Sequence, residues 1–313
     1  MVSVSSSAAS GHSAALTLLK GSSQSAAAAT KQSAASQILS SISGVNLDPL
    51  KQAEGQITRI LLESGGQFII GGAFSDITGT DKDDIIRAGP GSWVNGGDGD
   101  DIISGSFKMD ISGGAGSDTI SVSSGSTVDG GDGDDTISAG FENTMNGGAG
   151  ADTIYASHKN AVNAGSGDDV LTMGHDNLID AGAGDDTIYA GVGNTITGGT
   201  GNDRIVITDI QAALHGSTGS TVKFAVGDGR DSVTLVRSSS TLELGEGFTA
   251  ANTKVTFSNN KATISFDGNE TDRISVDFLF DSALTLSFAD GSTLEVKPGI
   301  VPAPTLVSSY GQA

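Results

Sequence analysis

The 313-residue sequence contains no cysteine. This absence excludes a disulfide framework and any metal site built from thiolates. Two interpretations remain open at this point: a cytosolic protein, or an exported protein whose stability has another source. The length has room for about two domains of ordinary size.

Basic residues are scarce, with 16 Lys and Arg against 37 Asp and Glu, which gives a formal net charge of −21. A chain of this charge repels phosphates, so we expect no nucleic acid partner and no binding to anionic membranes. Apolar residues nevertheless recur along most of the chain. The sequence is therefore unlike a disordered acidic tail.

Long apolar runs are missing as well. No segment reaches the roughly 18 apolar residues expected of a membrane-spanning helix, so no membrane span is predicted. The first four residues, Met-Val-Ser-Val, lack the basic start and apolar core of a cleaved secretory signal. If the protein is exported, we expect a route that requires neither feature.

Glycine, by contrast, is abundant, at 46 residues, which indicates backbone that repeatedly enters conformations closed to other residues. Two segments precede the regular part of the chain. Residues 1–44 hold 14 serines and 10 alanines, which predicts a low-complexity N-terminus, disordered or loosely helical. Residues 45–78 are expected to form an N-terminal cap with a short helix and a strand at 67–70. The helix is predicted by the spacing of Leu47, Leu50, Ile57, Ile60 and Leu61.

From residue 79 to 207 the sequence repeats with a period of 17 residues. The units begin at residues 79, 96, 113, 130, 147, 164, 181 and 198. Each starts with a nonamer, such as GGDGDDIIS (96–104) or AGAGDDTIY (181–189), and continues with eight looser residues. A fixed period without insertions over eight units is the signature of a solenoid.

Two positions of each unit are apolar. They are Ile86, Ile103, Ile120, Ile137, Ile154, Leu171, Ile188 and Ile205 at position eight, and Val94, Ile111, Val128, Met145, Val162, Ile179 and Ile196 at position sixteen. Two inward residues per turn, on two short strands, predict an all-β fold: a flattened roll of 17-residue turns. With strands about 4.8 Å apart, eight turns span about 35 Å. So thin a core is not expected to hold the chain by itself.

Aspartate occupies position six of every unit, as Asp84, Asp101, Asp118, Asp135, Asp152, Asp169, Asp186 and Asp203. Positions three and five add Asp81, Asp83, Asp98, Asp100, Asp132, Asp134, Asp168 and Asp185. Sixteen of the 37 acidic residues therefore stand in one file of stacked loops. Like charges at that spacing repel unless a cation lies between them.

Calcium suits this file because it takes about six to eight oxygen ligands, backbone carbonyls included, in flexible geometry. Glycines at positions two and four let the loop turn tightly enough to aim its carbonyls at the ion. They are Gly97, Gly114, Gly131, Gly148, Gly165, Gly182 and Gly199, and Gly99, Gly116, Gly133, Gly150, Gly167, Gly184 and Gly201. No nitrogen or sulfur ligand recurs in these loops, which argues against zinc and copper.

The nonamer resembles the GGxGxDxUx repeat of the RTX, or haemolysin-type, calcium-binding family. The resemblance implies a parallel β-roll with each ion held between successive loops, by position-six aspartates and by carbonyls. Eight loops leave seven gaps, hence up to seven Ca²⁺ ions, whose charge of +14 would change −21 to −7. Because the second half of each turn lacks the motif, we expect ions along one edge only. Asp118 and Asp152 are the weakest proposed ligands, since Ser117 and Ala151 precede them.

Residues 208–313 alternate apolar and polar residues between turn signals, which predicts an antiparallel β cap. The segment also resembles the domain that often follows RTX repeats, through FAVGDGRDSV (224–233), LELGEGF (242–248) and SFADGSTLEV (287–296). This resemblance implies a C-terminal folding cap and an uncleaved type I secretion signal. A structural cap is expected on physical grounds as well, because a last turn left uncovered exposes its edge.

On the edge opposite the aspartates, asparagine recurs at position fourteen, as Asn143, Asn160, Asn177 and Asn194, which predicts a stacked amide ladder. His158 and His175 share position twelve and should stack within about 5 Å. A transition-metal site there would lack a third ligand, so two exposed loop histidines are the plainer interpretation.

The outward strand positions are rich in Thr and Ser and carry Tyr155 and Tyr189. Such a face would suit a glycan, although strand propensity alone also explains it.

No Ser–His–Asp set and no zinc helix motif is present, so no catalytic residue is predicted. We therefore expect a secreted, extracellular or surface-associated calcium-binding protein of structural or adhesive type, ordered by calcium outside the cell. Its expected partners are calcium, the type I secretion apparatus, and surface polysaccharide or further copies of itself. The alternatives are a glycan-binding module and an accessory module of a secreted enzyme.

Overall fold

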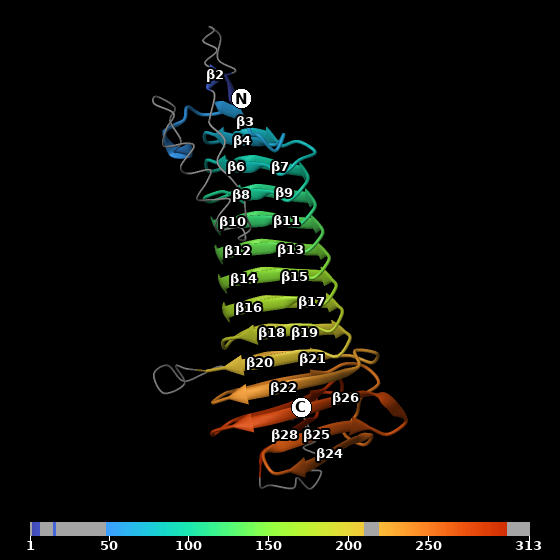
Figure 1. Ribbon diagram of the computed structural model, residues 1–313. Helices are drawn as coiled ribbons and strands as arrows, with labels where there is room; N and C mark the ends of the chain where they lie inside the picture. The colour runs from blue at the N-terminus through green and yellow to red at the C-terminus, as the bar shows by residue number, and fades with distance from the viewer. Residues whose placement is uncertain (1, 7–14, 17–47, 210–218, 299–313) are drawn as a thin grey trace.

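The computed structural model describes residues 2–6, 15–16, 48–209 and 219–298. These residues form an all-β parallel roll in which two sheets face each other, with antiparallel strands at its ends (Figure 1). The helical structure described is one short 3₁₀ turn, Pro49–Lys51. The predicted fold class is thereby confirmed.

The 16-stranded sheet is called the long sheet here, and the 12-stranded sheet the short sheet. In spatial order the long sheet contains β2 (Ala15–Leu16), β1 (Val2–Ser6), β3 (Ile57–Leu61), β4 (Gln67–Gly71), β6 (Ile85–Ala88), β8 (Ile102–Ser104), β10 (Thr119–Ser124), β12 (Thr136–Phe141), β14 (Thr153–His158), β16 (Val170–His175), β18 (Thr187–Ala190), β20 (Arg204–Thr208), β22 (Arg230–Val236), β26 (Asn269–Leu279), β25 (Lys261–Phe266) and β24 (Thr253–Ser258). The short sheet contains β28 (Thr293–Val296), β27 (Ala283–Phe288), β23 (Ser239–Leu244), β21 (Thr221–Phe224), β19 (Thr195–Thr200), β17 (Leu178–Ala183), β15 (Ala161–Ser166), β13 (Thr144–Ala149), β11 (Thr127–Asp132), β9 (Asp110–Ala115), β7 (Trp93–Asp98) and β5 (Asp76–Thr78).

The pairing register matches the 17-residue period of the sequence. In the long sheet Ile120 pairs with Ile103 on one side and with Ile137 on the other. In the short sheet Val128 lies between Ile111 and Met145 in the same way. Equivalent residues of successive turns are therefore direct neighbours, and every side chain is stacked on its own counterpart.

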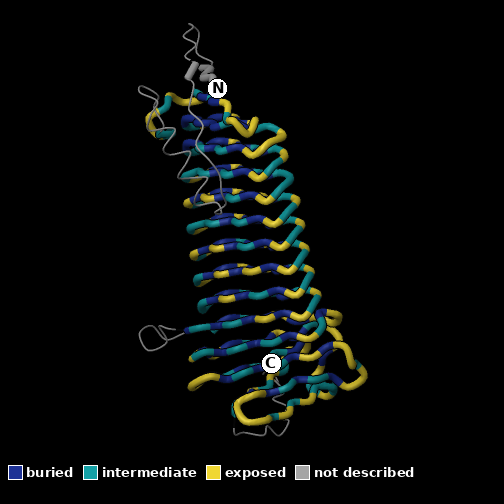
Figure 2. The backbone as a smooth tube through the Cα atoms, in the orientation of Figure 1, coloured by how far each residue is buried: buried dark blue, intermediate teal, exposed yellow. Residues whose placement is uncertain are grey.

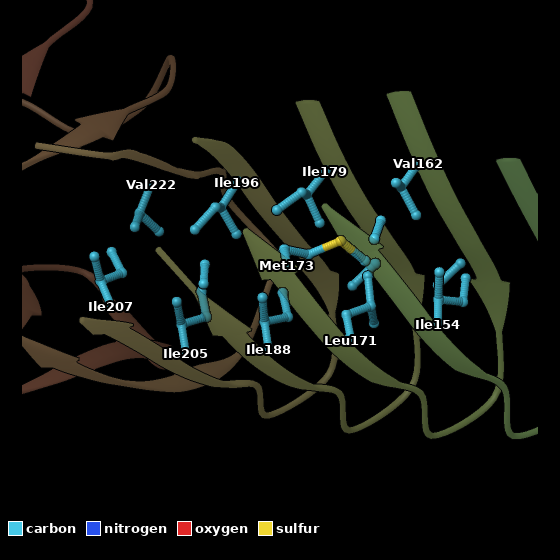
Figure 3. Close-up of a cluster of buried hydrophobic side chains, with 14 of the residues drawn as sticks. Ile154, Val162, Leu171, Met173, Ile179, Ile188, Ile196, Ile205, Ile207 and Val222 are labelled. Carbon is cyan, nitrogen blue, oxygen red and sulfur yellow. The ribbon is translucent and has the colours of Figure 1, made fainter. Parts of the chain in front are cut away.

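The core lies between the two sheets. Figure 3 shows Ile154, Leu171, Ile188 and Ile205 of the long sheet facing Val162, Ile179, Ile196 and Val222 of the short sheet. Burial alternates with exposure along most strands of the roll (Figure 2). Position ten of the unit also points inward, as in Val122, Met173 and Ile207. The expectation of two inward residues per turn was therefore too low, and the core is thicker than predicted.

The N-terminal end of the roll is covered by strands. β1 and β3 pair antiparallel, β3 pairs antiparallel with β4, and β4 begins the parallel series with β6. The predicted amphipathic helix is wrong in its second half, because Ile57 to Leu61 form a strand. Three of those five residues, Ile57, Thr58 and Ile60, are β-branched, and such side chains favour a pleated surface. The predicted low-complexity segment, residues 1–44, lies outside the described residues except for β1 and β2.

The C-terminal end carries the expected antiparallel strands, but they begin later than residue 208. The parallel series continues across residue 208, with β22 and β26 following β20 in the long sheet and β21, β23 and β27 following β19 in the short sheet. Antiparallel pairing is confined to β24, β25 and β26 and to the pair of β27 with β28. Insertions lengthen these last turns, so their sequence no longer shows the period of 17. The predicted secretion signal near the C-terminus falls partly on residues 299–313, outside the described residues.

Within the described part of the chain, no helix is long and apolar enough to cross a membrane.

The stacked core predicts a large cost for a single truncation. Ile137→Ala removes a fully buried side chain in the middle of the roll, and we expect the free energy of unfolding to fall by about 2–5 kcal/mol. Val170→Ala is the matched control, because Val170 is 39% exposed and its loss should change stability by no more than about 0.5 kcal/mol. Urea unfolding in saturating calcium measures both. Equal costs for the two variants would contradict the assignment of inward and outward faces.

Candidate metal centre

The repeated loops are sharp turns that join the short sheet to the long sheet. In the second unit Gly97 and Gly99 have φ of +114° and +112°, in the region that side chains rarely adopt. A Cβ on Gly97 would also collide with the carbonyl oxygen of Thr80 in the preceding turn. These glycines thus allow each loop to lie directly against the previous one, with backbone carbonyls between them.

The position-six aspartates are buried under these loops, each only 1% exposed. In each of them from Asp101 to Asp203, Oδ1 accepts a hydrogen bond from the backbone N–H of the aspartate one turn earlier. The distance is 2.7 Å from Asp84 N to Asp101 Oδ1 and 2.9 Å from Asp186 N to Asp203 Oδ1. One oxygen of each carboxylate therefore ties its turn to the preceding turn.

The second oxygen of each carboxylate has no such partner. The Oδ2 atoms without any hydrogen bond are those of Asp101, Asp118, Asp135, Asp152, Asp169, Asp186 and Asp203, all buried. A Cβ built on Gly96 would clash with both Asp101 Oδ2 and the carbonyl oxygen of Gly113, so these two oxygens converge on one point. The same convergence recurs at Gly113, Gly130 and Gly147. A carboxylate oxygen beside a carbonyl oxygen of the next turn is the hard donor set that calcium takes.

Burial has a direct effect on the charge of these groups. Desolvation raises the pKa of Asp101, Asp135, Asp169 and Asp186 to about 7, and that of Asp118, Asp152 and Asp203 to about 6. The backbone hydrogen bond to Oδ1 opposes this rise, and repulsion from neighbouring aspartates adds to it. At neutral pH the file therefore holds negative charge only at a free-energy cost that a bound cation would remove.

The first aspartate of the file is different. Asp84 Oδ2 accepts hydrogen bonds from the backbone N–H and the hydroxyl of Thr80, at 2.5 and 3.0 Å, and Gln67 N donates to Asp84 Oδ1. The reason lies in the first unit, where Thr80 and Lys82 replace the glycines of positions two and four. Asp84 is thus satisfied by the protein itself, and the row of unpartnered oxygens begins at Asp101.

The position-five aspartates are exposed and act on the backbone. Asp100 Oδ1 accepts from Ser117 N at 3.0 Å, Asp134 Oδ1 from Ala151 N at 2.8 Å and Asp168 Oδ1 from Asp185 N at 2.8 Å. Each therefore caps position five of the following turn. Asp98 and Asp132, at position three, end β7 and β11 with exposed side chains. The structure brings all of them to the same edge as the position-six file, but at its surface.

One member of the aspartate file was missed in the sequence. Asp203 N donates to Asp231 Oδ1 at 3.0 Å, as every earlier position-six aspartate donates to its successor. Asp231 is 6% exposed, and desolvation raises its pKa to about 8. The signal that would have found it is the spacing G-x-G-x-D in Gly227-Asp228-Gly229-Arg230-Asp231. It was hidden because Asp231 follows Asp203 by 28 residues, not by 17.

The opposite edge carries the predicted amide ladder. Asn143 N donates to Asn160 Oδ1, Asn160 N to Asn177 Oδ1 and Asn177 N to Asn194 Oδ1, all within 2.9 Å, and these four side chains are buried. Serines continue the ladder at both ends, because Met109 N donates to Ser126 Oγ and Asn194 N to Ser220 Oγ. The backbone of this edge is thus satisfied without a metal.

Aromatic rings stack beside this ladder. The ring centroids of Phe141 and His158 are 5.3 Å apart and those of His158 and His175 are 5.0 Å apart. His175 Nδ1 lies 2.9 Å from Asp176 Oδ2. Across the described residues there is no group of three or more His, Cys, Asp or Glu side chains that could hold a metal ion.

Comparison with known proteins agrees with this geometry. The profile of the RTX calcium-binding nonapeptide repeat, in four copies, matches residues 78–107, 110–143, 123–154, 140–171, 173–195 and 193–206. Residues 78–206 are therefore RTX calcium-binding repeats. No curated protein matches the chain.

Among solved structures, the extracellular lipase LipA from Serratia marcescens is similar at 16% identity and a TM-score of 0.27. The similarity covers 63% of this chain and 36% of the lipase chain, so the protein spans little more than a third of that neighbour.

The raised pKa values predict the pH dependence of the calcium-free protein. The folded aspartates keep protons up to about pH 7, whereas in the unfolded chain they lose them near pH 4. The folded state therefore binds more protons between these values, and the free energy of unfolding should decrease as pH rises from about 4 to 7. Far-UV circular dichroism of calcium-stripped protein between about pH 4 and pH 7 measures this as a loss of β-structure with rising pH. A stability that increases over the same range would contradict it.

Proposed function

We propose that the protein is a secreted calcium-binding protein of structural or adhesive type, whose roll folds when it meets calcium outside the cell. The observation that carries the proposal is the file of seven buried Oδ2 atoms without a hydrogen-bond partner. A buried polar atom without a partner destabilises the fold by about 1–3 kcal/mol, and a charged one by more. Seven of them in one row would work against folding unless cations bind.

The residues that would hold calcium are the position-six aspartates from Asp101 to Asp203, through Oδ2, and the backbone carbonyls of the neighbouring loops. The ion supplies positive charge between turns. The protein supplies the spacing, because every Oδ1 is fixed by a hydrogen bond and leaves Oδ2 directed beside the next turn. Since this arrangement exists only when the turns are stacked, the free energy of calcium binding becomes free energy of folding.

The unpartnered carboxylates also support export before folding. At low calcium the buried carboxylates oppose stacking, so the chain would stay unfolded inside the cell and remain able to pass a type I secretion apparatus. Outside, calcium would take the part that disulfides play in other exported proteins, in a chain that has no cysteine. We infer an extracellular or cell-surface location on this basis.

We also infer that the chain has no catalytic activity of its own. RTX repeats are a structural calcium-binding element. The paired aspartates that resemble a glycosidase dyad have separate tasks here, since Asp134 caps Ala151 N while Asp135 accepts from Asp118 N. Neither is left as a single acid or base in a cleft.

The test is far-UV circular dichroism of the protein in chelator, followed by titration with calcium and then with magnesium. We expect a cooperative transition from coil to β-structure with calcium and none with magnesium, which demands a stricter octahedral geometry. A protein with full β-structure in chelator, unchanged by calcium, would refute the proposal.

A substitution sharpens this test. Asp135→Asn keeps the shape of the side chain but removes its charge. We expect the calcium midpoint to rise about tenfold, while the calcium-free protein at pH 7.5 becomes more stable, because an unpaired buried charge is lost. The control is Asp110→Asn, on an exposed aspartate of the short sheet. If both variants titrate like the unmodified protein, Asp135 is not a ligand.

A second candidate function is supported by the outer face of the long sheet. A shallow depression of about 470 Å³ lies over β10, β12, β14 and β16, lined by Ser121, Val122, Ser138, Ala139, Tyr155, Ala156, Ser157 and Thr172. Tyr155 and Tyr189 are 47% and 43% exposed, and each pairs with Thr172 between them. Two strand spacings separate the tyrosines by about 10 Å. Hydroxyls beside exposed rings would suit a linear polysaccharide on the cell surface.

This second function has its own measurement. Affinity electrophoresis in gels containing defined polysaccharides should show calcium-dependent retardation that Tyr155→Ala reduces at least tenfold. Phe107→Ala serves as the control, because Phe107 is an equally exposed aromatic, at 46%, outside the depression. Retardation that is unaffected by Tyr155→Ala would exclude this face as the binding site.

A further inference from the structure

The calcium ladder does not stop where the recognisable repeats stop. We infer that residues 226–234 form a ninth calcium-binding loop, and that a calcium ion is held between it and the loop of residues 198–203. This inference rests on the proposed function, since it assigns one more site to the same file. It places a calcium site inside the segment that the sequence marks only as a C-terminal cap.

The backbone of this loop repeats that of the earlier ones. Gly227 and Gly229 have φ of +97° and +104°, close to the values at Gly97 and Gly99. Gly229 pairs with Gly201, and a Cβ on Gly229 would collide with the Gly201 carbonyl oxygen. A backbone hydrogen bond that joins each loop to the next is also present at this loop.

That bond runs from the position-four N–H to the position-three carbonyl of the next turn. It is Gly201 N to Asp228 O here, at 2.9 Å, and Gly184 N to Thr200 O one turn earlier, also at 2.9 Å. The loop therefore has the turn geometry of a calcium-binding repeat, although 28 residues separate Asp203 from Asp231.

The carboxylate of the preceding turn points to the same conclusion. Asp203 is 1% exposed, and its Oδ2 is buried without a hydrogen-bond partner. In the earlier units Oδ2 lies beside the first carbonyl of the following turn, as Asp118 Oδ2 lies beside Gly130 O. For Asp203 the following turn is the loop at 226–231, to which its backbone N–H is bonded through Asp231 Oδ1.

Three further carboxylates stand at the loop, and their tasks differ. Asp228 Oδ2 accepts from Ala225 N at 2.6 Å. Asp231 Oδ1 accepts from Asp203 N, as a position-six aspartate does. Asp272 is instead committed to the backbone, because its Oδ2 accepts from Gly227 N at 2.8 Å and from Asn269 Nδ2 at 2.7 Å. In the turn after that, Ile274 lies opposite Asp231. An isoleucine cannot bind calcium, so the file of ligands ends at Asp231.

The charge at position five sets this site apart. Arg230 stands at position five, which is aspartate in four earlier loops, as Asp100, Asp134, Asp168 and Asp185. The Arg230 side chain is exposed, and its Nε lies 3.4 Å from Thr271 O. A positive charge beside a cation site weakens binding. The ninth loop should therefore fill at a higher calcium concentration than the loops of residues 96–203.

The experiment counts calcium ions by native mass spectrometry on the full chain. We expect Asp231→Asn to bind one ion fewer than the unmodified protein, because the amide keeps the acceptor for Asp203 N but removes the negative charge that the ninth loop brings to the site. Asp267→Asn, on an exposed turn aspartate between β25 and β26, should leave the count unchanged. Equal counts for all three proteins would overturn the inference.

Hydrogen exchange on the unmodified protein gives a second measurement, which stands even if Asp231→Asn does not fold. The amides of residues 226–234 should gain protection with calcium, at a higher concentration than those of residues 96–203. Protection at 226–234 that is independent of calcium, while 96–203 responds, would overturn the ninth site alone. If no part of the chain binds calcium, the proposed function itself fails.

Discussion

The whole architecture depends on a carboxylate that is buried with only one of its two oxygens satisfied. In the seven turns from Asp101 to Asp203 the aspartate at position six joins its own turn to the preceding one through Oδ1 and leaves Oδ2 inside the protein without a partner. The same residue therefore stabilises the stacking of turns through Oδ1 and destabilises it through the buried charge on Oδ2. The inward apolar side chains set the distance between the two sheets. The protonation or neutralisation of the aspartates sets the conditions under which the turns stack.

The two edges of the roll solve the same backbone problem in two ways. On one edge neutral asparagines satisfy the turn amides, and their Nδ2 groups donate as well, for example from Asn160 to His158 O. On the other edge aspartates accept the equivalent amides but bring charge with them. The hydrogen bonds of the asparagine edge are therefore complete without any bound ion. The charge of the aspartate edge, by contrast, depends on the pH and the cations of the solution. The asparagine edge should thus stay stacked under all conditions, whereas stacking of the aspartate edge should require neutralisation of its charge.

The sequence was most informative where the period was unbroken. A spacing of 17 residues was enough to predict the stacked register of Ile120 and Ile137, the asparagine ladder and the aspartate file. It did not predict Thr80 as the partner of Asp84, because that contact depends on a local loss of glycine. It missed the inward position ten, where small residues such as Ala156 gave no periodic signal. The parallel strands after residue 208 were missed because insertions hide the repeat, while the short-range alternation of β24 and β25 was visible.

The aspartate file also gives the roll a polarity. At its first turn an acceptor, Asp84 Oδ1, is closed by a donor from β4, Gln67 N. At its last turn the glycine donors of the final loop are closed by an acceptor, Asp272. A roll without these two closures would present acceptors at one end and donors at the other, which is the condition for heterologous, head-to-tail growth. The end segments thus satisfy hydrogen-bonding groups that the repeat leaves open at its first and last loops.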